Sequence, residues 1–87
     1  MEKEKVFSEV QVIFNDVFSD ENIIITENSS PSDIEAWDSL QHIVLLLTIE
    51  KKFNIKFHSS ETQDLNSVKL ICNRVYEKLI SKTTIVN

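Results

Sequence analysis

The sequence predicts an all-α domain: a small four-helix bundle of three main helices and one short helix, with a long loop between the first and second main helices. Two observations support this prediction. Apolar residues recur every three or four positions in three separate segments, which is the period of an amphipathic helix, and the 87 residues include no glycine and one proline. With 41% apolar and 26% charged residues, the chain has the composition of one small domain, which we expect to span residues 1–87.

The first helix is expected over about residues 3–18. Its apolar stripe holds Val6, Val10, Ile13 and Val17, flanked by Phe7, Phe14 and Phe18. The connection that follows, about residues 19–37, is longer than a helix hairpin requires, which favours a loop that packs on the bundle and carries function. Within it, Ser30-Pro31-Ser32-Asp33 predicts a short helical turn, with Ser30 as the cap and proline at the first helical position.

The second main helix is expected from Leu40 to Phe53. Apolar residues dominate it and leave a narrow polar stripe, which predicts a mostly buried helix whose core residues include Leu40, Ile43, Leu47 and Ile49. Asp38 is a good N-cap, since its carboxylate can accept from the free N–H groups of the first turn. This cap would place Ser39 in the first turn with its hydroxyl near solvent, and Asn54 would end the helix.

Residues 54–60 are predicted to form an extended linker. A strand through Ile55 and Phe57 is the competing interpretation, which the shortness of the segment disfavours. Residues 61–65 suggest one short helical turn. Asn66 or Ser67 then caps a final helix to about Ser81, whose inward residues are expected to be Val68, Ile71, Cys72, Val75, Leu79 and Ile80. The structured core is therefore expected over residues 3–81, with residues 82–87 as a flexible tail.

Charge is distributed unevenly along the chain. Between Lys5 and Lys51 there is no lysine or arginine, whereas nine acidic residues fall there. This pattern disfavours nucleic acid as a partner and favours basic protein surfaces, although acidic residues also simply keep small proteins in solution. No apolar run approaches the roughly 18 residues of a membrane span. We therefore expect a cytoplasmic monomer that does not insert into membranes.

Several classes of chemistry find no support in these residues. The absence of glycine excludes phosphate-cradling and dinucleotide-binding glycine loops, and a single cysteine excludes an internal disulfide. Two histidines and one cysteine, widely separated, form no base and nucleophile pair and suggest no zinc site. Cys72 falls on the inward stripe of the last helix, so packing is its expected role. We do not expect the chain to be an enzyme.

The segment Trp37-Asp38-Ser39-Leu40, the apolar helix behind it, Glu50-Lys51-Lys52-Phe53-Asn54-Ile55 and the capped last helix together resemble an acyl carrier protein, as far as about Ile80. Phe53 follows Ser39 by fourteen residues, which makes the match more specific than the short motif alone. The resemblance implies that Ser39 is esterified with 4′-phosphopantetheine from coenzyme A, whose thiol carries acyl groups as thioesters. It also implies a phosphopantetheinyl transferase as partner, a magnesium-binding role for Asp38 when that enzyme docks, and an interior that can part to shelter a short acyl chain.

The chain departs from the usual pattern of this family in two ways. Acidic residues are common along the helix after the serine, but here that helix offers only Glu50, and the acidic surface lies upstream at Asp33, Glu35 and Asp38. Tryptophan also replaces the usual glycine-containing lead-in to the motif. These departures suggest dedicated partners in a specialised fatty acid, lipid, polyketide or polysaccharide-modifying pathway. The residues expected to contact acyl-loading and acyl-using enzymes, which would offer basic patches, are Asp33, Glu35, Trp37, Leu40, Gln41, Val44 and Glu50.

Alternatives remain open at this point. Trp37 either packs as an anchor of the long loop, which its amphipathic ring favours, or lies exposed as a recognition surface. His42 either approaches the phosphate or is an exposed helix histidine, which is the favoured interpretation. For the whole chain, the alternatives are an unmodified helical adaptor that binds a basic protein surface, and a carrier of an aminoacyl group.

Overall fold

The structure, a computed structural model, describes residues 2–84, with side chains up to Ser81. Four helices make up this part of the chain: α1 (Lys3–Val17), α2 (Ser39–Phe53), α3 (Ser59–Thr62) and α4 (Val68–Thr84). No strand occurs among the described residues, and residues 55–58 have no regular secondary structure. The predicted all-α bundle of three main helices and one short helix is confirmed. None of the described helices is both long enough and apolar enough to cross a membrane.

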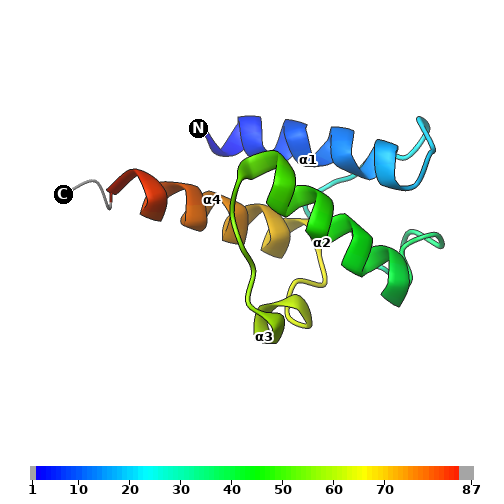
Figure 1. Cartoon of the computed structure of the whole chain (residues 1–87). Coiled ribbons are helices and arrows are strands. Elements are labelled where there is room, and N and C mark those ends of the chain that lie inside the picture. The colour runs from blue at the N-terminus through cyan, green and yellow to red at the C-terminus, as the bar shows by residue number, and fades with distance from the viewer. Residues whose placement is uncertain (1, 85–87) are drawn as a thin grey trace.

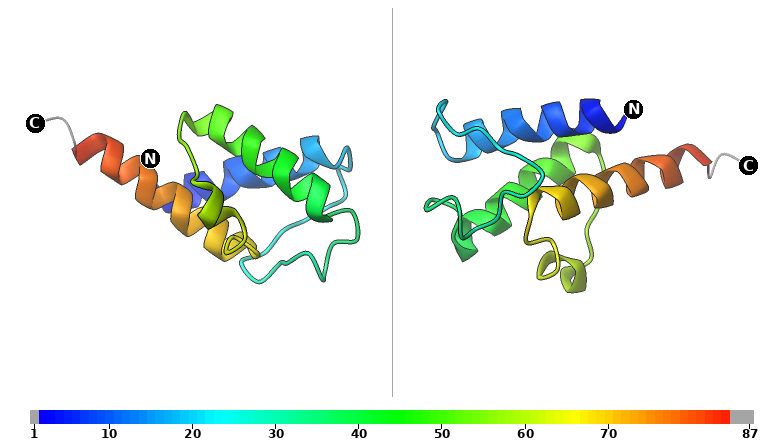
Figure 2. Two further views of the ribbon diagram at one scale, coloured as in Figure 1. Left: turned by 60° about the horizontal axis from the view of Figure 1, so that its bottom comes forward. Right: turned by 180° about the vertical axis from the view of Figure 1, so that it is seen from behind.

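Helix α1 packs against both α2 and α4 and forms the centre of the helix packing. Figure 1 shows α1 along one side of the molecule and the short α3 on the opposite side, in the connection between α2 and α4. The right-hand view of Figure 2, from behind, also shows α3 on the side of the molecule away from α1. The long loop from α1 to α2 occupies the end of the molecule at which α2 begins, so the loop and the start of α2 form one region.

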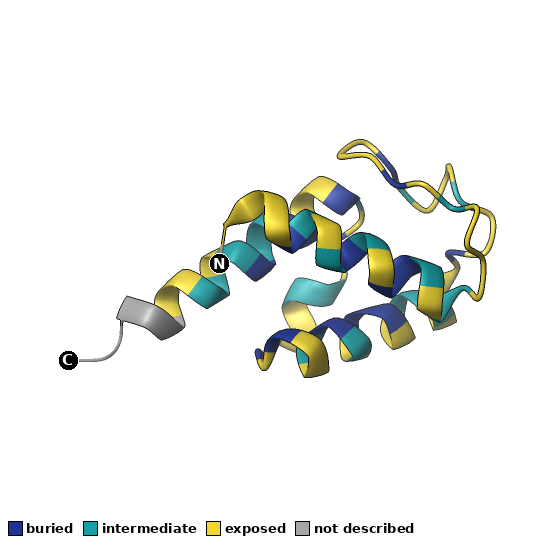
Figure 3. Cartoon of the chain, turned by 90° about the horizontal axis from the view of Figure 1, so that it is seen from above, coloured by how far each residue is buried: buried dark blue, intermediate teal, exposed yellow. Residues whose placement is uncertain are grey.

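The core lies where the three main helices and the loop meet. Figure 3 shows the buried positions concentrated on the faces that the helices turn toward one another. The predicted stripe of α1 is buried at Val6, Val10 and Ile13, together with Phe14. Val17, Phe7 and Phe18 are partly buried against the same core. The loop contributes Ile25 and Trp37, so the expectation that it packs on the bundle is confirmed.

The ends of α2 follow the sequence prediction closely. Asp38 is the N-cap, in an extended conformation, and its Oδ1 accepts from the Gln41 N–H at 2.8 Å. At the other end, Asn54 takes the left-handed conformation with φ of 55° and ends the helix after Phe53. Asparagine tolerates this conformation better than most residues, which makes it a suitable terminator in a chain without glycine.

The prediction that α2 is mostly buried is wrong for one face. Leu40, Ile43, Val44 and Leu47 have exposed fractions between 39% and 68%, whereas Leu45, Leu46, Ile49 and Phe53 are buried. This face stays exposed because the helix beside it, α3, is short. Helix α2 has 15 residues and α3 has 4, so at about 1.5 Å per residue a helix of about 6 Å faces one of about 22 Å. Helix α3 is too short to cover the second apolar face of α2.

Two further helices, α3 and α4, differ from prediction in their bounds. Helix α3 occupies residues 59–62 instead of 61–65. The Glu61 carboxylate accepts from the His58 N–H at 2.5 Å, and this capping arrangement starts the helix two residues earlier than predicted. Residues 30–33 form the single turn predicted there: the Asp33 N–H donates to the Ser30 carbonyl, and the Asp33 carboxylate accepts from the Ser30 N–H.

The last helix starts as expected and ends later than expected. Ser67 is its cap, since the Ser67 hydroxyl accepts from the Leu70 N–H at 3.2 Å. The helix continues to Thr84, beyond the predicted end at Ser81, so part of the predicted tail is helical. Residues 85–87 of that tail lie outside the described residues. Of the predicted inward residues, Leu79 is partly buried against the core and Ile80 is exposed. One residue is about 100° around a helix, so Ile80 points away from the stripe on which Leu79 lies.

Candidate functional site

Ser39 is the first residue of α2, and its side chain is exposed. The hydroxyl makes no hydrogen bond to any other residue that the structure describes. Asp38 organises the first turn from two sides: its carboxylate accepts from the Gln41 N–H, and its carbonyl accepts from the His42 N–H at 2.8 Å. The capped turn therefore holds the Ser39 oxygen at the helix N-terminus, open to solvent, as the sequence predicted.

The start of α2 is also a favourable place for an anion. The peptide dipoles of the 15-residue helix add up to a partial positive charge at this end. Gln41 and His42 use their N–H groups on Asp38, and the N–H groups of Ser39 and Leu40 have no acceptor among the described residues. A negative group joined to the Ser39 oxygen would lie beside these donors, without any basic side chain.

Trp37 anchors the loop immediately before this turn. Its side chain is 2% exposed and packs edge-on against Phe14, with the ring centroids 5.1 Å apart. Its indole Nε1–H donates to His42 Nδ1 at 2.9 Å. The packing interpretation of Trp37 is confirmed, and a side chain this buried offers no recognition surface of its own.

His42 takes a role that the sequence did not indicate. The prediction of an exposed helix histidine is wrong, because the ring is half-buried and both of its nitrogens are engaged. Nδ1 accepts from Trp37, and Nε2 lies 3.0 Å from the carbonyl oxygen of Thr62 at the end of α3. Trp37 and His42 are five residues apart, so the contact between them is local in the sequence. The contact with Thr62 forms only when the folded chain brings α3 beside α2.

Ser39 opens onto a hollow of about 670 Å³ between the loop, α2 and α3. Its walls are formed by Pro31, Trp37, Asp38, Ser39, His42, Ile43, Thr62, Gln63 and Asn66. A second hollow of about 330 Å³ lies further along α2, with Ile43, Leu46, Leu47, Glu50, Lys56, Phe57, Ser59 and Thr62 around it. Both hollows lie between α2 and α3, on the side where α2 keeps its apolar residues exposed.

Most of the other residues predicted to contact partner enzymes lie near Ser39, and Glu50 lies near the far end of α2. Asp33 and Glu35 are exposed on the loop that leads to α2, and Leu40 is exposed beside Ser39. Gln41 is half-buried, and Val44 is exposed one turn further along. Glu50 is different, because its carboxylate accepts from the Phe57 N–H at 2.6 Å and so holds the linker against α2. It also lies about 16 Å along the helix axis from Ser39.

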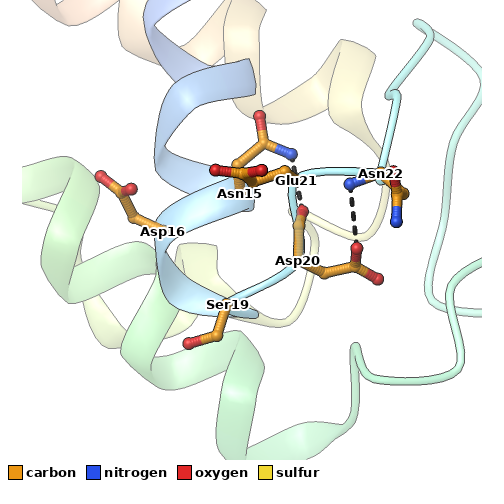
Figure 4. A pocket seen from close by; sticks show the side chains of 6 residues that line it. All are labelled: Asn15, Asp16, Ser19, Asp20, Glu21 and Asn22. Atoms are coloured by element: carbon orange, nitrogen blue, oxygen red, sulfur yellow. Dashed lines mark hydrogen bonds between the residues drawn. The ribbon is translucent and has the colours of Figure 1, made fainter.

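A third hollow, of about 570 Å³, lies at the end of α1 and is lined by Asn15, Asp16, Ser19, Asp20, Glu21 and Asn22. Figure 4 shows the carboxylates of Asp16 and Asp20 pointing in different directions. Asn15 donates to the Asp20 carbonyl and Asn22 to the Asp20 carboxylate, both at 2.9 Å. No group of three His, Cys, Asp or Glu side chains within the described residues could hold a metal ion. These hydrogen bonds shape a turn after α1.

Cys72 is buried in the core on α4, as predicted. Burial, and to a lesser extent the nearby Glu27 carboxylate, raise the pKa of its thiol to about 11. A thiol with so little thiolate at neutral pH is a poor nucleophile, so the packing role is supported.

Comparisons with known proteins agree with one another, although no family model matches the chain. It is 30% identical over 82 residues to an acyl carrier protein of Coprothermobacter proteolyticus, covering 94% of this chain and all of that one. It is 30% identical over 80 residues to an acyl carrier protein of Petrotoga mobilis, covering 91% and 93% of the two chains. The solution structure of the holo acyl carrier protein from Geobacter metallireducens superposes with a TM-score of 0.84 and 37% identity over 91% of each chain. The chain therefore belongs to the acyl carrier protein family.

Proposed function

We propose that this chain is a carrier whose Ser39 oxygen is joined through a phosphodiester to 4′-phosphopantetheine, donated from coenzyme A. The observation that carries the proposal is the position of Ser39: an exposed hydroxyl on the first residue of a capped helix, beside a hollow of about 670 Å³. The similar protein from Geobacter metallireducens was solved in a form described as holo, which supports a prosthetic group in the family.

The residues around Ser39 fit such a group. Its phosphodiester would lie at the positive end of the helix dipole, where an exposed anion is typically stabilised by about 0.3–1 kcal/mol. The side chains of Gln63 and Asn66, which line the same hollow, offer amide groups to a polar arm. When bound, the group supplies a thiol on a flexible arm, and this thiol carries acyl groups as thioesters. Asp38, already the N-cap, has an exposed carboxylate that a metal ion brought by a transferase could use.

Among the described residues, the histidine beside Ser39 is not available as a base for the serine. His42 is the titratable nitrogen group nearest in sequence, but Nδ1 accepts from Trp37 and Nε2 contacts the Thr62 carbonyl. A ring engaged at both nitrogens cannot take the proton of the Ser39 hydroxyl. We infer that modification is performed by a separate phosphopantetheinyl transferase and that this chain acts as a substrate of other enzymes, not as a catalyst.

The partner enzymes are proposed to dock around the start of α2. Asp33, Glu35 and Asp38 are exposed there, and no lysine or arginine occurs between Lys5 and Lys51. A basic patch on a partner enzyme would therefore be steered toward Ser39. Leu40 and Val44 add exposed apolar surface. The cargo is proposed to be a fatty acyl, hydroxyacyl, polyketide or aminoacyl group of a specialised pathway.

Steering is tested by neutralising both loop acids in Asp33→Asn/Glu35→Gln. We expect slower association with the transferase at low salt, and the difference from wild type should fade as salt screens the charges. Glu2→Gln/Glu4→Gln is the matched control, because it removes two exposed acids at the far end of α1. Equal slowing by both pairs, or no slowing at low salt, would remove the steering argument.

Modification itself is tested by incubating the protein with coenzyme A, magnesium and a broad-specificity phosphopantetheinyl transferase, followed by intact mass measurement. Wild type should gain one phosphopantetheine, and Ser39→Ala should gain none. The control Ser60→Ala, which changes another exposed serine, should gain one. Ser39→Ala should cost at most about 1 kcal/mol of stability, so its failure to react would not reflect unfolding. An unmodified wild type would favour the adaptor alternative, and modification of Ser39→Ala would move the site elsewhere.

A further inference from the structure

The exposed apolar residues of α2 form a row that ends in lysine. Leu40, Val44 and Leu47 are exposed and follow one another at helical spacing. Lys51 is also exposed and continues this row, four residues after Leu47 and about 16 Å along the helix from Leu40. Lys56, in the linker after α2, is exposed and lines the smaller hollow together with Leu47. The α2 row, from Leu40 to Lys51, therefore has two positive charges at its far end.

These two lysines differ from their neighbours in having no ionic role in the fold. Lys52 pairs with Glu9 of α1 at 3.2 Å, and Lys5 pairs with the same carboxylate at 4.0 Å. Lys51 lies about 100° around the helix from Lys52, and neither Lys51 nor Lys56 forms an ion pair with a residue that the structure describes. Lys51 also suits the negative end of the helix dipole, but this does not account for Lys56, which lies outside the helix.

The first end of the α2 row carries the opposite charge. Three exposed acids lie on the loop and cap that lead into it: Asp33, Glu35 and Asp38. Glu50, the one acidic residue of α2, is half-buried, and its carboxylate accepts from the Phe57 N–H. The exposed charge around the row thus changes from negative beside Ser39 to positive past Leu47. A partner surface with only basic groups would match the first end and be repelled at the second.

We propose that the α2 row docks a partner protein whose contact strip is basic at one end, apolar in the middle and acidic at the other. The basic end lies against the acids beside Ser39, the apolar part covers Leu40 to Leu47, and the acidic end meets Lys51 and Lys56. This inference deepens the proposed function, which uses basic patches alone. It rests on that function only in taking the partner to be an enzyme that acts at Ser39.

Two other occupants fit the α2 row less well. A second copy of the chain, placed antiparallel, would also match acid with base. It would cover Leu40, next to Ser39, with a chain that we do not expect to act on that serine. A nucleic acid or an anionic membrane would be repelled by the acids at the first end of the row. A partner enzyme satisfies both ends and brings chemistry to Ser39.

The charges set how strongly the α2 row should select among partners. One exposed ion pair changes an equilibrium by about 1.4- to 5-fold, so pairs at Lys51 and Lys56 together should change it by roughly 2- to 30-fold. This selection should fade as salt screens the charges, whereas the contribution of the apolar middle should remain. An enzyme with a wholly basic strip loses both pairs and meets repulsion in their place, so the two lysines also select against it.

The test uses the unmodified protein and two synthetic helical peptides with the same apolar stripe. One peptide has arginines at one end and glutamates at the other, and the second has arginines at both ends. Titrations followed by amide chemical shifts give the affinity and the place of binding. We expect the mixed peptide to bind roughly 2- to 30-fold more tightly, with shifts along the α2 row. The net charge of −5 favours the doubly basic peptide, so this preference would report the local lysines. A nitroxide at the glutamate end should broaden amides near Lys51 more than those near Ser39.

Variants assign the preference to the two lysines. Lys51→Ala/Lys56→Ala should abolish it, and Lys51→Glu/Lys56→Glu should reverse it. Lys5→Ala/Lys52→Ala is the matched control, because it removes two exposed lysines that pair with Glu9, and it should keep the preference.

Several outcomes would overturn the docking proposal. These are equal binding of both peptides to wild type, binding away from the α2 row or none at all, and equal effects of the Lys51/Lys56 and Lys5/Lys52 alanine variants. A wild-type dimer in sedimentation that Lys51→Glu/Lys56→Glu dissociates would assign the row to a second copy. Failure of Ser39 to accept phosphopantetheine would count against the proposed function alone, since the peptides do not need that modification.

Discussion

The Glu61 carboxylate joins the start of α3 to α4, and neutralising it should weaken the fold in a way that depends on pH. Its Oε2 accepts from the His58 N–H and lies 3.2 Å from Lys78 Nζ, while its Oε1 pairs with Arg74 Nη1. The Glu61 side chain is 12% exposed. Glu77 also pairs with Arg74, at 3.5 Å, but is 70% exposed, which makes Glu77→Gln a matched control for Glu61→Gln.

The magnitude follows from the pKa of Glu61. Burial raises this pKa, but the His58 N–H and the charges of Arg74 and Lys78 outweigh burial and lower it from 4.5 to about 2. One unit of pKa corresponds to about 1.4 kcal/mol. Because the Arg74 side chain is 37% exposed, solvent screens part of the interaction, and we expect on the order of 1–2 kcal/mol. The folded-state pKa is the lower one, so this stability is fully present above pH 4.5 and is lost as the pH falls toward 2.

Urea denaturation followed by circular dichroism, from pH 7 down to pH 2.5, measures this contribution. At pH 7, Glu61→Gln should unfold with a free energy about 1–2 kcal/mol below wild type, and Glu77→Gln should lie within about 0.5 kcal/mol of it. The gap between wild type and Glu61→Gln should close as the pH falls below 4.5. Equal losses in the two variants, or a gap that is as large at pH 2.5 as at pH 7, would refute the reasoning.

Three further outcomes are expected from single residues. Asp38→Ala should lower the free energy of unfolding by about 0.5–2 kcal/mol in urea, because it removes the N-cap of α2; no change would contradict the capping role. Trp37→Ala should cost about 3–5 kcal/mol in the same assay, since it empties a buried site; a loss below 1 kcal/mol would show that the loop is anchored elsewhere. Cys72, buried and with a thiol pKa raised to about 11, should react with a thiol reagent at pH 8 only after unfolding, and rapid labelling of the folded protein would contradict its burial.

The parts of the site that depend on neighbouring residues were predictable from the sequence. Asp38 caps α2 and Ser39 begins it because a cap and a first turn need only a few consecutive residues. Asn54 ends the same helix for an equally local reason. The hydrophobic period located the three main helices, because each contributes a continuous stripe to one core.

The parts that depend on distant segments were not predictable. Leu40 and Leu47 looked like core residues because periodicity shows that a face is apolar, not whether another helix is long enough to cover it. His42 looked exposed because its second partner, Thr62, lies twenty residues away in sequence. Glu50 looked available to partners because the linker N–H of Phe57 that it binds reaches it only after the chain turns at Asn54.

The attachment of phosphopantetheine to the Ser39 oxygen is tested most directly by locating the group within the modified wild-type protein. After transfer from coenzyme A, proteolysis and tandem mass spectrometry should find the added mass on the peptide that contains Ser39, with fragment ions that assign it to that serine. We expect modification at this one serine and at no other residue. Modification on a peptide without Ser39, or no modified peptide from a transferase that modifies another acyl carrier protein under the same conditions, would contradict it.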